Sequence, residues 1–254
     1  MTDIRSSGLV AAAIQFEPQR GQLERNRNKL LLLLSAALQA QPELVVLPEM
    51  CTSGYIFHDP ESIMPFCEQR GGHSERLFSS EAVRSGATIC YGWPEHDPES
   101  GGLFNSASVC FPDGQVLHYR KKLLYDADRP WAEPGDTPYP VWTSRHGLRC
   151  SLGICMDLND DDFIRFLVDQ KIRVLAFPTN WLDQGFKVWN YWAYRLDGTE
   201  TCLVAGNRYG VEDGTPFCGD SAVLDGRVLL GCTEANEDTV VLAHIPERPT
   251  PYED

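Results

Sequence analysis

Short apolar runs alternate with amphipathic stretches along most of the chain. Residues 9–16 (LVAAAIQF) and 43–48 (ELVVLP) are apolar almost throughout, which is typical of strands buried on both faces. Residues 21–41 carry Leu, Ala, Arg and Asn at helical spacing and stop before Pro42, because the residue that precedes a proline disfavours helix. The first fifty residues therefore predict a strand, a helix and a second strand.

The same alternation continues towards the C-terminal end. Further strands are expected at 87–93, 149–154, 173–178 and 202–208, and further helices at 74–85, 159–170 and 187–201. Pro112-Asp113-Gly114 predicts a hairpin turn between strands 105–111 and 114–122, and residues 220–245 predict two or three short strands. No linker, repeat or low-complexity tract interrupts the pattern. We expect one layered α/β domain with mixed sheets over residues 1–254.

Charge and composition narrow the class of protein. Of 254 residues, 22 are Lys or Arg and 36 are Asp or Glu, so the formal net charge is −14. This charge argues against a nucleic acid or an anionic membrane surface as the main partner. The longest aliphatic run, residues 30–34, is far shorter than the roughly 20 residues that span a bilayer, and the N-terminus has no signal-peptide pattern. We expect a soluble cytoplasmic protein.

Nine cysteines, an odd number without regular spacing, do not form the pattern of a disulfide framework. No Cys-x-x-Cys occurs and no two histidines are spaced four apart, so we expect no metal site. Most of these cysteines are expected to be small buried apolar side chains. Cys155 is the exception considered next.

Three chemically active side chains stand at the ends of predicted strands. Glu49 follows the second strand, Lys121 and Lys122 close the second hairpin strand, and Cys155 follows strand 149–154. Each has a plain structural interpretation as well: a solvated glutamate, a solvated basic strand end and a core cysteine. In α/β folds, however, sites form at the C-terminal ends of strands.

Taken together, these groups predict nucleophilic catalysis. A thiol of ordinary pKa is only a few per cent thiolate at neutral pH, so it needs a base or a positive neighbour. A carboxylate can take the proton, and a lysine can stabilise both the thiolate and a developing oxyanion. A strand-to-helix turn after Cys155 would add backbone N–H donors. This set suits acyl transfer at an amide or nitrile carbon, without a metal or organic cofactor.

In this order and spacing, the three segments resemble the Glu–Lys–Cys motifs of the nitrilase superfamily of carbon–nitrogen hydrolases. The main motifs are LPEMCTSGY at 47–55, YRKKLLY at 119–125 and GICMDLN at 153–159. Lesser signatures agree, namely Asn105-Ser106, Glu133-Pro134-Gly135-Asp136, Pro178-Thr179-Asn180-Trp181, Asn207-Arg208 and Phe217-Cys218-Gly219-Asp220-Ser221. The resemblance implies a four-layer αββα sandwich with two mixed sheets, and a homodimer or higher homo-oligomer formed through helices.

The resemblance also implies roles for individual residues. Glu49 matches the family's general base and Cys155 its nucleophile. The family's lysine follows Tyr-Arg or a similar pair, which selects Lys121 and leaves Lys122 as a solvated or ion-paired residue. Strand alternation agrees, because Lys121 shares a face with Tyr119.

One position departs from the family pattern. Many members have a second glutamate about eight residues after the lysine, where it helps to hold the lysine and to position the substrate. Arg129 stands there in this chain, directly after Asp128. Asp128 is therefore a candidate for the role with a shorter side chain; the alternative is that the role is absent.

The implied reaction converts a small linear amide to a carboxylic acid and ammonia through a thioester on Cys155. Glu49 would move the protons, while Lys121 and the backbone N–H of Met156 would stabilise the oxyanion. Residues expected to bind substrate are Tyr55, Asp128, Trp131, Met156, Asn180 and Trp181.

The motif around the nucleophile resembles protein N-terminal asparagine amidases more than dicarboxylate ω-amidases. The latter often carry an arginine two residues after the motif's aspartate, where this chain has Asn159. An N-carbamoyl amidohydrolase and a nitrilase are the alternatives; nitrilases usually have a longer tail than residues 247–254 here. A catalytically inactive binding protein is the non-enzymatic alternative.

Overall fold

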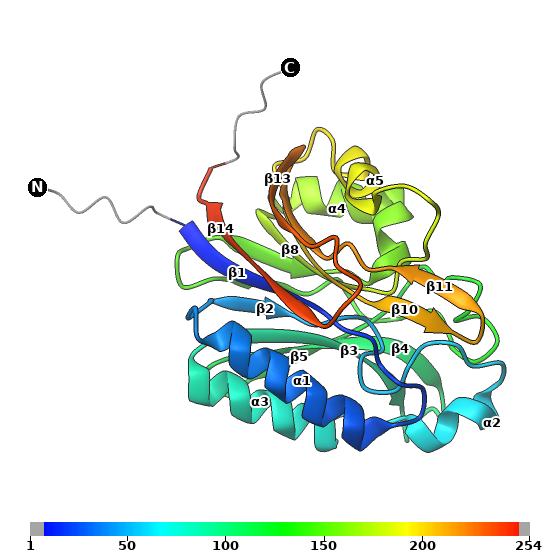
Figure 1. The fold of residues 1–254 in the computed structure, drawn as a ribbon. Coiled ribbons are helices and arrows are strands. Elements are labelled where there is room, and N and C mark those ends of the chain that lie inside the picture. Colours follow the sequence, from blue (N-terminus) through cyan, green and yellow to red (C-terminus); the bar gives the residue numbers. More distant parts are fainter. Residues whose placement is uncertain (1–7, 249–254) are drawn as a thin grey trace, which may run out of the picture.

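Two six-stranded β-sheets stack face to face, and helices cover the outer face of each sheet (Figure 1). The computed structural model describes residues 8–248. The first half contains β1 (Gly8–Gln15), α1 (Leu23–Leu38), β2 (Leu44–Val46), α2 (Pro60–Ile63), a 3-10 turn (Met64–Phe66), α3 (His73–Ser85), β3 (Thr88–His96), β4 (Leu103–Cys110) and β5 (Val116–Arg120).

The second half begins with β6 (Val141–Thr143), β7 (Arg149–Leu152), a 3-10 turn (Cys155–Asn159), α4 (Asp161–Asp169), β8 (Val174–Thr179) and α5 (Val188–Arg195). It ends with β9 (Cys202–Asn207), β10 (Tyr209–Glu212), β11 (Thr215–Cys218), β12 (Ala222–Asp225), β13 (Val228–Cys232) and β14 (Thr239–Pro246). The strand order is β14-β1-β2-β3-β4-β5 in one sheet and β13-β12-β9-β8-β7-β6 in the other. The predicted αββα arrangement of two mixed sheets is confirmed.

Alternation along β1 explains why its sequence is apolar throughout. Ala12 and Ile14 pack in a cluster with residues of α1 and α3, whereas Ala11 and Ala13 belong to the cluster that includes strands of the second sheet. Both faces of the strand are therefore covered, one by helices and the other by the opposite sheet. Among residues 8–248, no helix is long and apolar enough to cross a membrane.

Strand direction brings the three candidate segments to one end of the sandwich. β2 runs parallel to β3, and β5 returns to the same direction after two antiparallel pairings. β7, β8 and β9 are mutually parallel in the other sheet. The loops that follow these strands carry the candidate residues.

Several boundaries differ from those expected. The helix predicted at 159–170 begins at Asp161, because the Asp160 side chain caps it by accepting from the N–H of Asp162. The helix predicted at 187–201 is shorter, since α5 ends at Arg195. The Thr199 hydroxyl then donates to the carbonyl of Leu196. Strand β6 and hairpin β10–β11 were not expected.

Candidate active site

Lys121 lies immediately after β5 and holds two carboxylates. Its Nζ donates to Glu49 Oε1 at 2.8 Å and to Asp128 Oδ2 at 2.6 Å, and all three side chains are fully buried. Burial acts to lower the pKa of Lys121, but the charges of Asp128 and Glu49 outweigh it and raise this pKa above its ordinary value. The lysine is therefore cationic at neutral pH.

Asn105 on β4 joins the same two carboxylates. Its Nδ2 donates to Glu49 Oε1 at 2.7 Å and to Asp128 Oδ1 at 2.9 Å. The backbone N–H of Tyr125 also donates to Asp128 Oδ2 at 2.9 Å. Asp128 thus lies against the lysine, the contact expected of a residue that helps to hold it. Asn105 appeared in the sequence only as part of a lesser motif, and its bridging contacts were not predicted.

Glu49 keeps one oxygen free. Its Oε2 is buried and accepts no hydrogen bond within residues 8–248. Burial raises the pKa of Glu49, and the nearby charge of Lys121 opposes this effect. The loop passes so close to β3 that a Cβ on Gly92 would lie 2.5 Å from the Glu49 Cα, so only glycine fits there. The Glu49 backbone thus lies directly against β3, and Oε2 of its carboxylate is available to accept a proton.

Cys155 begins the 3-10 turn after β7 with a φ of +43°, an uncommon conformation for a residue other than glycine. Asp157 stabilises this turn by accepting from the N–H of Ile154 at 2.9 Å and from the Tyr119 hydroxyl at 2.8 Å. It also accepts from the N–H groups of residues 122 and 123. Asp157 therefore ties the nucleophile's turn to the loop that carries Lys121, a role not found from the sequence.

Burial raises the pKa of the Cys155 thiol, and the neighbouring charge of Glu49 raises it further. Lys121, the Thr179 hydroxyl and the N–H of Asn180 act in the opposite sense. Cys155 is therefore protonated at neutral pH, and its reaction as a nucleophile needs a base during attack.

A cavity of about 260 Å³ opens beside Cys155. It is lined by Tyr125, Cys155, Met156, Asn159, Asn180, Trp181, Leu182, Gln184, Phe186 and Tyr191. Of the residues expected to bind substrate, Met156, Asn180 and Trp181 lie in this lining.

Tyr55, Asp128 and Trp131, also expected to bind substrate, are not part of the lining. Tyr55 and Asp128 lie against Lys121, and Trp131 contacts Asp128. The Tyr55 ring centroid is 5.8 Å from Lys121 Nζ, and the backbone N–H of Trp131 donates to the backbone carbonyl of Asp128 at 3.1 Å. Among residues 8–248, no group of three or more His, Cys, Asp or Glu side chains is arranged to hold a metal ion.

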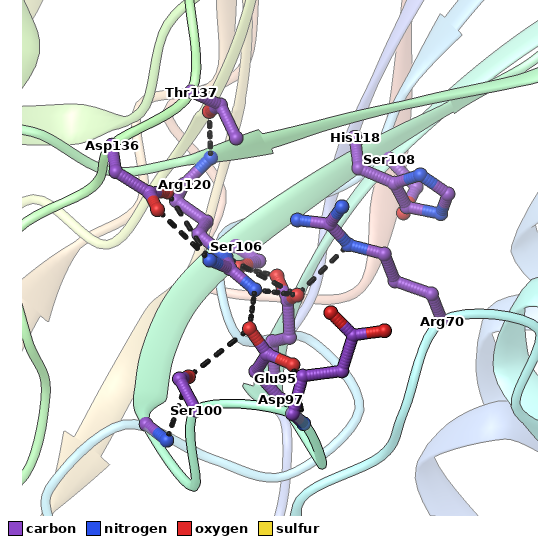
Figure 2. A network of polar contacts seen from close by, with 12 residues as sticks. Arg70, Glu95, Asp97, Ser100, Ser106, Ser108, His118, Arg120, Asp136 and Thr137 are labelled. Carbon is purple, nitrogen blue, oxygen red and sulfur yellow. Dashed lines mark hydrogen bonds and ion pairs between the residues drawn. The ribbon is translucent and has the colours of Figure 1, made fainter.

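The residues on either side of Lys121 make different contacts. Arg120 is enclosed by Glu95, Asp97 and Asp136 (Figure 2). Lys122 Nζ lies 4.1 Å from the centroid of the Tyr139 ring. Of these three consecutive cations, Lys121 is the one that contacts Glu49.

Comparisons with known proteins point to one family. A family model described as carbon–nitrogen hydrolase matches residues 10–252. The chain is 29% identical to a protein N-terminal amidase of Schizosaccharomyces pombe, over 91% of this chain and 98% of that protein.

Two solved structures share the fold. An N-terminal amidase crystallised with an Asn-Glu-Ala peptide has a TM-score of 0.81 at 20% identity, over 94% of this chain and 98% of its own. A mutant amidase from Nesterenkonia sp. AN1, with the acetamide moiety of fluoroacetamide added covalently at its active-site cysteine, has a TM-score of 0.80 at 20% identity, over 96% and 92%. The match of the family model over nearly the whole chain settles the relationship: this protein belongs to the carbon–nitrogen hydrolase family.

Proposed function

We propose that this protein hydrolyses linear primary amides to carboxylic acids and ammonia through a thioester on Cys155. The observation that carries the proposal is the buried Glu49–Lys121 ion pair, which acts electrostatically on a cysteine that lines a cavity. Glu49 Oε2 is unpaired, as a proton acceptor must be.

In the first half-reaction, Glu49 takes the thiol proton while Sγ of Cys155 attacks the amide carbon. The C=O electron pair moves onto oxygen, and Lys121 and the backbone N–H of Met156 stabilise this oxyanion. The first N–H groups of a helical turn lack partners within the turn, so the Met156 N–H is suited to this task. The intermediate then collapses, the C–N bond breaks, and Glu49 returns the proton to the departing ammonia.

In the second half-reaction, Glu49 removes a proton from water as the water attacks the thioester carbon. The C–S bond breaks, the acid leaves, and Cys155 regains its proton. Asp128 and Asn105 hold Lys121 and Glu49 in place throughout and act as positioning residues.

The similarity to a protein N-terminal amidase supports amide hydrolysis. The covalent adduct in the Nesterenkonia amidase supports attack by a cysteine. The cytoplasmic location and the homo-oligomer stay predictions.

The test is ammonia release by the wild-type protein from a panel of simple amides, N-terminal Asn and Gln peptides, N-carbamoyl acids and nitriles. Cys155→Ala, at the same concentration and with unchanged circular dichroism, is the control and should release none. If the wild type releases no ammonia from any compound, and electrophiles label Cys155 no faster than the other cysteines, the protein is a binding protein instead.

A further inference from the structure

The cavity beside Cys155 has a lining without charge. None of its ten residues is Asp, Glu, Lys or Arg, and Tyr125, Trp181, Phe186 and Tyr191 supply aromatic walls. Its volume of about 260 Å³ lies at the small end for ligand sites. A charged group that enters such a lining loses hydration without gaining an ionic partner.

Asn180 offers the lining an unused donor and an unused acceptor. The residue is 2% exposed, and neither Nδ2 nor Oδ1 has a hydrogen-bond partner within residues 8–248. Asn159 differs, because its Oδ1 accepts from the Tyr191 hydroxyl at 2.6 Å and its Nδ2 lies 3.1 Å from Met156 Sδ. Asn180 is thus free to bind an uncharged polar group, such as the carbonyl oxygen and the NH₂ of an amide.

The carboxylates next to the lining in sequence are already engaged. Asp157 accepts from Tyr119 and from backbone N–H groups. Asp183 accepts from the N–H of Gly185, and Asp126 is ion-paired with Arg129. Each of these carboxylates therefore has a partner outside the lining, and none of them is itself part of the lining.

Lys187, a cation next to the lining in sequence, is engaged as well. Lys187 follows Phe186 and pairs with both Asp220 and Glu234 at 3.1 Å. A substrate carboxylate would therefore compete with two existing acidic partners. The lining holds no partner for an anion either.

Glu49 Oε2 is the unpaired carboxylate oxygen of the catalytic cluster, but it cannot serve as an ammonium site without cost. A cation held against Glu49 would lower its pKa and weaken it as the acceptor of the Cys155 proton. Binding an ammonium there would oppose the first chemical step.

We propose that this cavity selects uncharged primary amides with a small apolar or aromatic acyl group, held through Asn180, and rejects amides that carry an α-ammonium or a distal carboxylate. This selectivity rests on the proposed amide hydrolysis. It separates the protein from an enzyme for N-terminal asparagine, for ω-amides of dicarboxylates or for N-carbamoyl amino acids, all of which carry such a charge.

The experiment compares amides of equal shape and different charge. One pair is 2-methylbutyramide and 2-aminobutyramide, in which an ammonium replaces a methyl group. The other is 4-methylpentanamide and succinamate, in which a carboxylate replaces an isopropyl group. Two quantities are measured: kcat/KM for ammonia release by the wild type, and the Kd of the same compounds for Cys155→Ala by calorimetry.

In each pair, the neutral amide should have a kcat/KM about 100-fold higher and a Kd about 100-fold lower than the charged amide. Above pH 8 the α-amine of 2-aminobutyramide loses its proton. The preference for the neutral amide in the ammonium pair (the first ratio) should therefore shrink by about tenfold per pH unit, while the preference in the carboxylate pair (the second ratio) stays constant. Equal or better use of the charged members would overturn the selectivity. No ammonia from any compound, with the Kd ratios intact, would overturn amide hydrolysis and leave the selectivity standing.

Gln184 allows a matched reversal, because it lines the cavity at its exposed edge. Gln184→Glu should narrow the first ratio by about threefold, and Gln184→Lys should narrow the second by a similar factor. If both ratios change in the same direction in both variants, charge is not the basis of the selectivity. Asn180→Ala should weaken Kd for both neutral amides, and unchanged Kd values would remove Asn180 from the proposal.

Discussion

Arg120 and Lys121 are neighbours in the chain, yet each is the centre of a different cluster of buried charge. Around Arg120, Glu95 uses both oxygens: Oε1 accepts from Arg120 and Arg70, and Oε2 accepts from Ser106. Around Lys121, Glu49 uses only Oε1. The two glutamates are buried to a similar degree, but their hydrogen bonding is complete in one case and incomplete in the other.

The electrostatic consequences are opposite. Burial opposes ionisation of Glu95, but hydrogen bonds from Arg120 and Ser106 outweigh it and lower its pKa. Burial dominates at Glu49 and raises its pKa. A fully satisfied carboxylate is stabilised as an anion and is a poor proton acceptor. Incomplete hydrogen bonding is therefore what separates the candidate base from a structural ion pair in this molecule.

The largest effect is expected from Lys121→Ala. Removing this cation takes away oxyanion stabilisation and leaves two carboxylates facing each other, so kcat/KM for a neutral amide should fall by more than about 10³-fold. Steady-state ammonia release measures the loss, and circular dichroism shows whether the variant is folded. A folded Lys121→Ala protein with near wild-type turnover would contradict the assignment of Lys121.

Glu49→Gln should lower kcat by on the order of 10³-fold, because the amide keeps the shape of the side chain but cannot accept the thiol proton. Slow hydrolysis should also let an acyl-enzyme accumulate on Cys155, visible by intact mass after soaking with substrate. Consistent absence of any adduct, across several amides, would count against the proposed order of steps.

Glu95→Gln is the matched change in the other cluster. It breaks the pair with Arg120, so the free energy of unfolding should drop by about 3–5 kcal/mol, measured by urea denaturation. Turnover per folded molecule should stay within about threefold of wild type. A large loss of kcat in a stable Glu95→Gln protein would remove the distinction between the clusters.

The two carboxylates also predict separate pH dependences. Glu49 must be ionised to act as a base, so kcat/KM should fall with decreasing pH through its raised pKa, above the ordinary 4.5. Glu95 has a lowered pKa, so its stabilising contribution is complete above the ordinary pKa of 4.5 and disappears as pH falls through the lower folded value. Rate profiles and denaturation across pH 3–8 should therefore show activity lost before this part of the stability.

The smallest effect is expected from Lys122→Ala. This change removes a cation–π contact with Tyr139, worth about 0.5–1 kcal/mol, and touches neither carboxylate cluster. Turnover should stay within about threefold of wild type in the ammonia assay. If Lys122→Ala abolishes turnover while Lys121→Ala does not, the catalytic lysine has been placed one residue too early.

Much of the fold was predictable from local patterns. Apolar runs and turn signals act over a few residues. The structure has strands at the apolar runs of β1, β2 and β8, and a turn between β4 and β5 at residues 112–114. Hairpin β10–β11 was missed although Asp213-Gly214 at its turn is a strong hairpin signal, and both residues have positive φ. The hairpin also makes contacts far away in the chain, because Glu212 accepts from the backbone N–H groups of Tyr55 and Ile56.

By itself, the sequence determined the succession of strands and helices and the residue types at the strand ends, because apolar periodicity and turn chemistry are encoded within short segments. The tertiary structure alone decided that Asp128 contacts Lys121, that Asn105 bridges both carboxylates, and that the cavity is uncharged. The state of Glu49 depends on partners 56 and 72 residues away in the chain. Such partners meet only when the sheets have formed, so no local pattern specifies which oxygen of Glu49 stays unpaired.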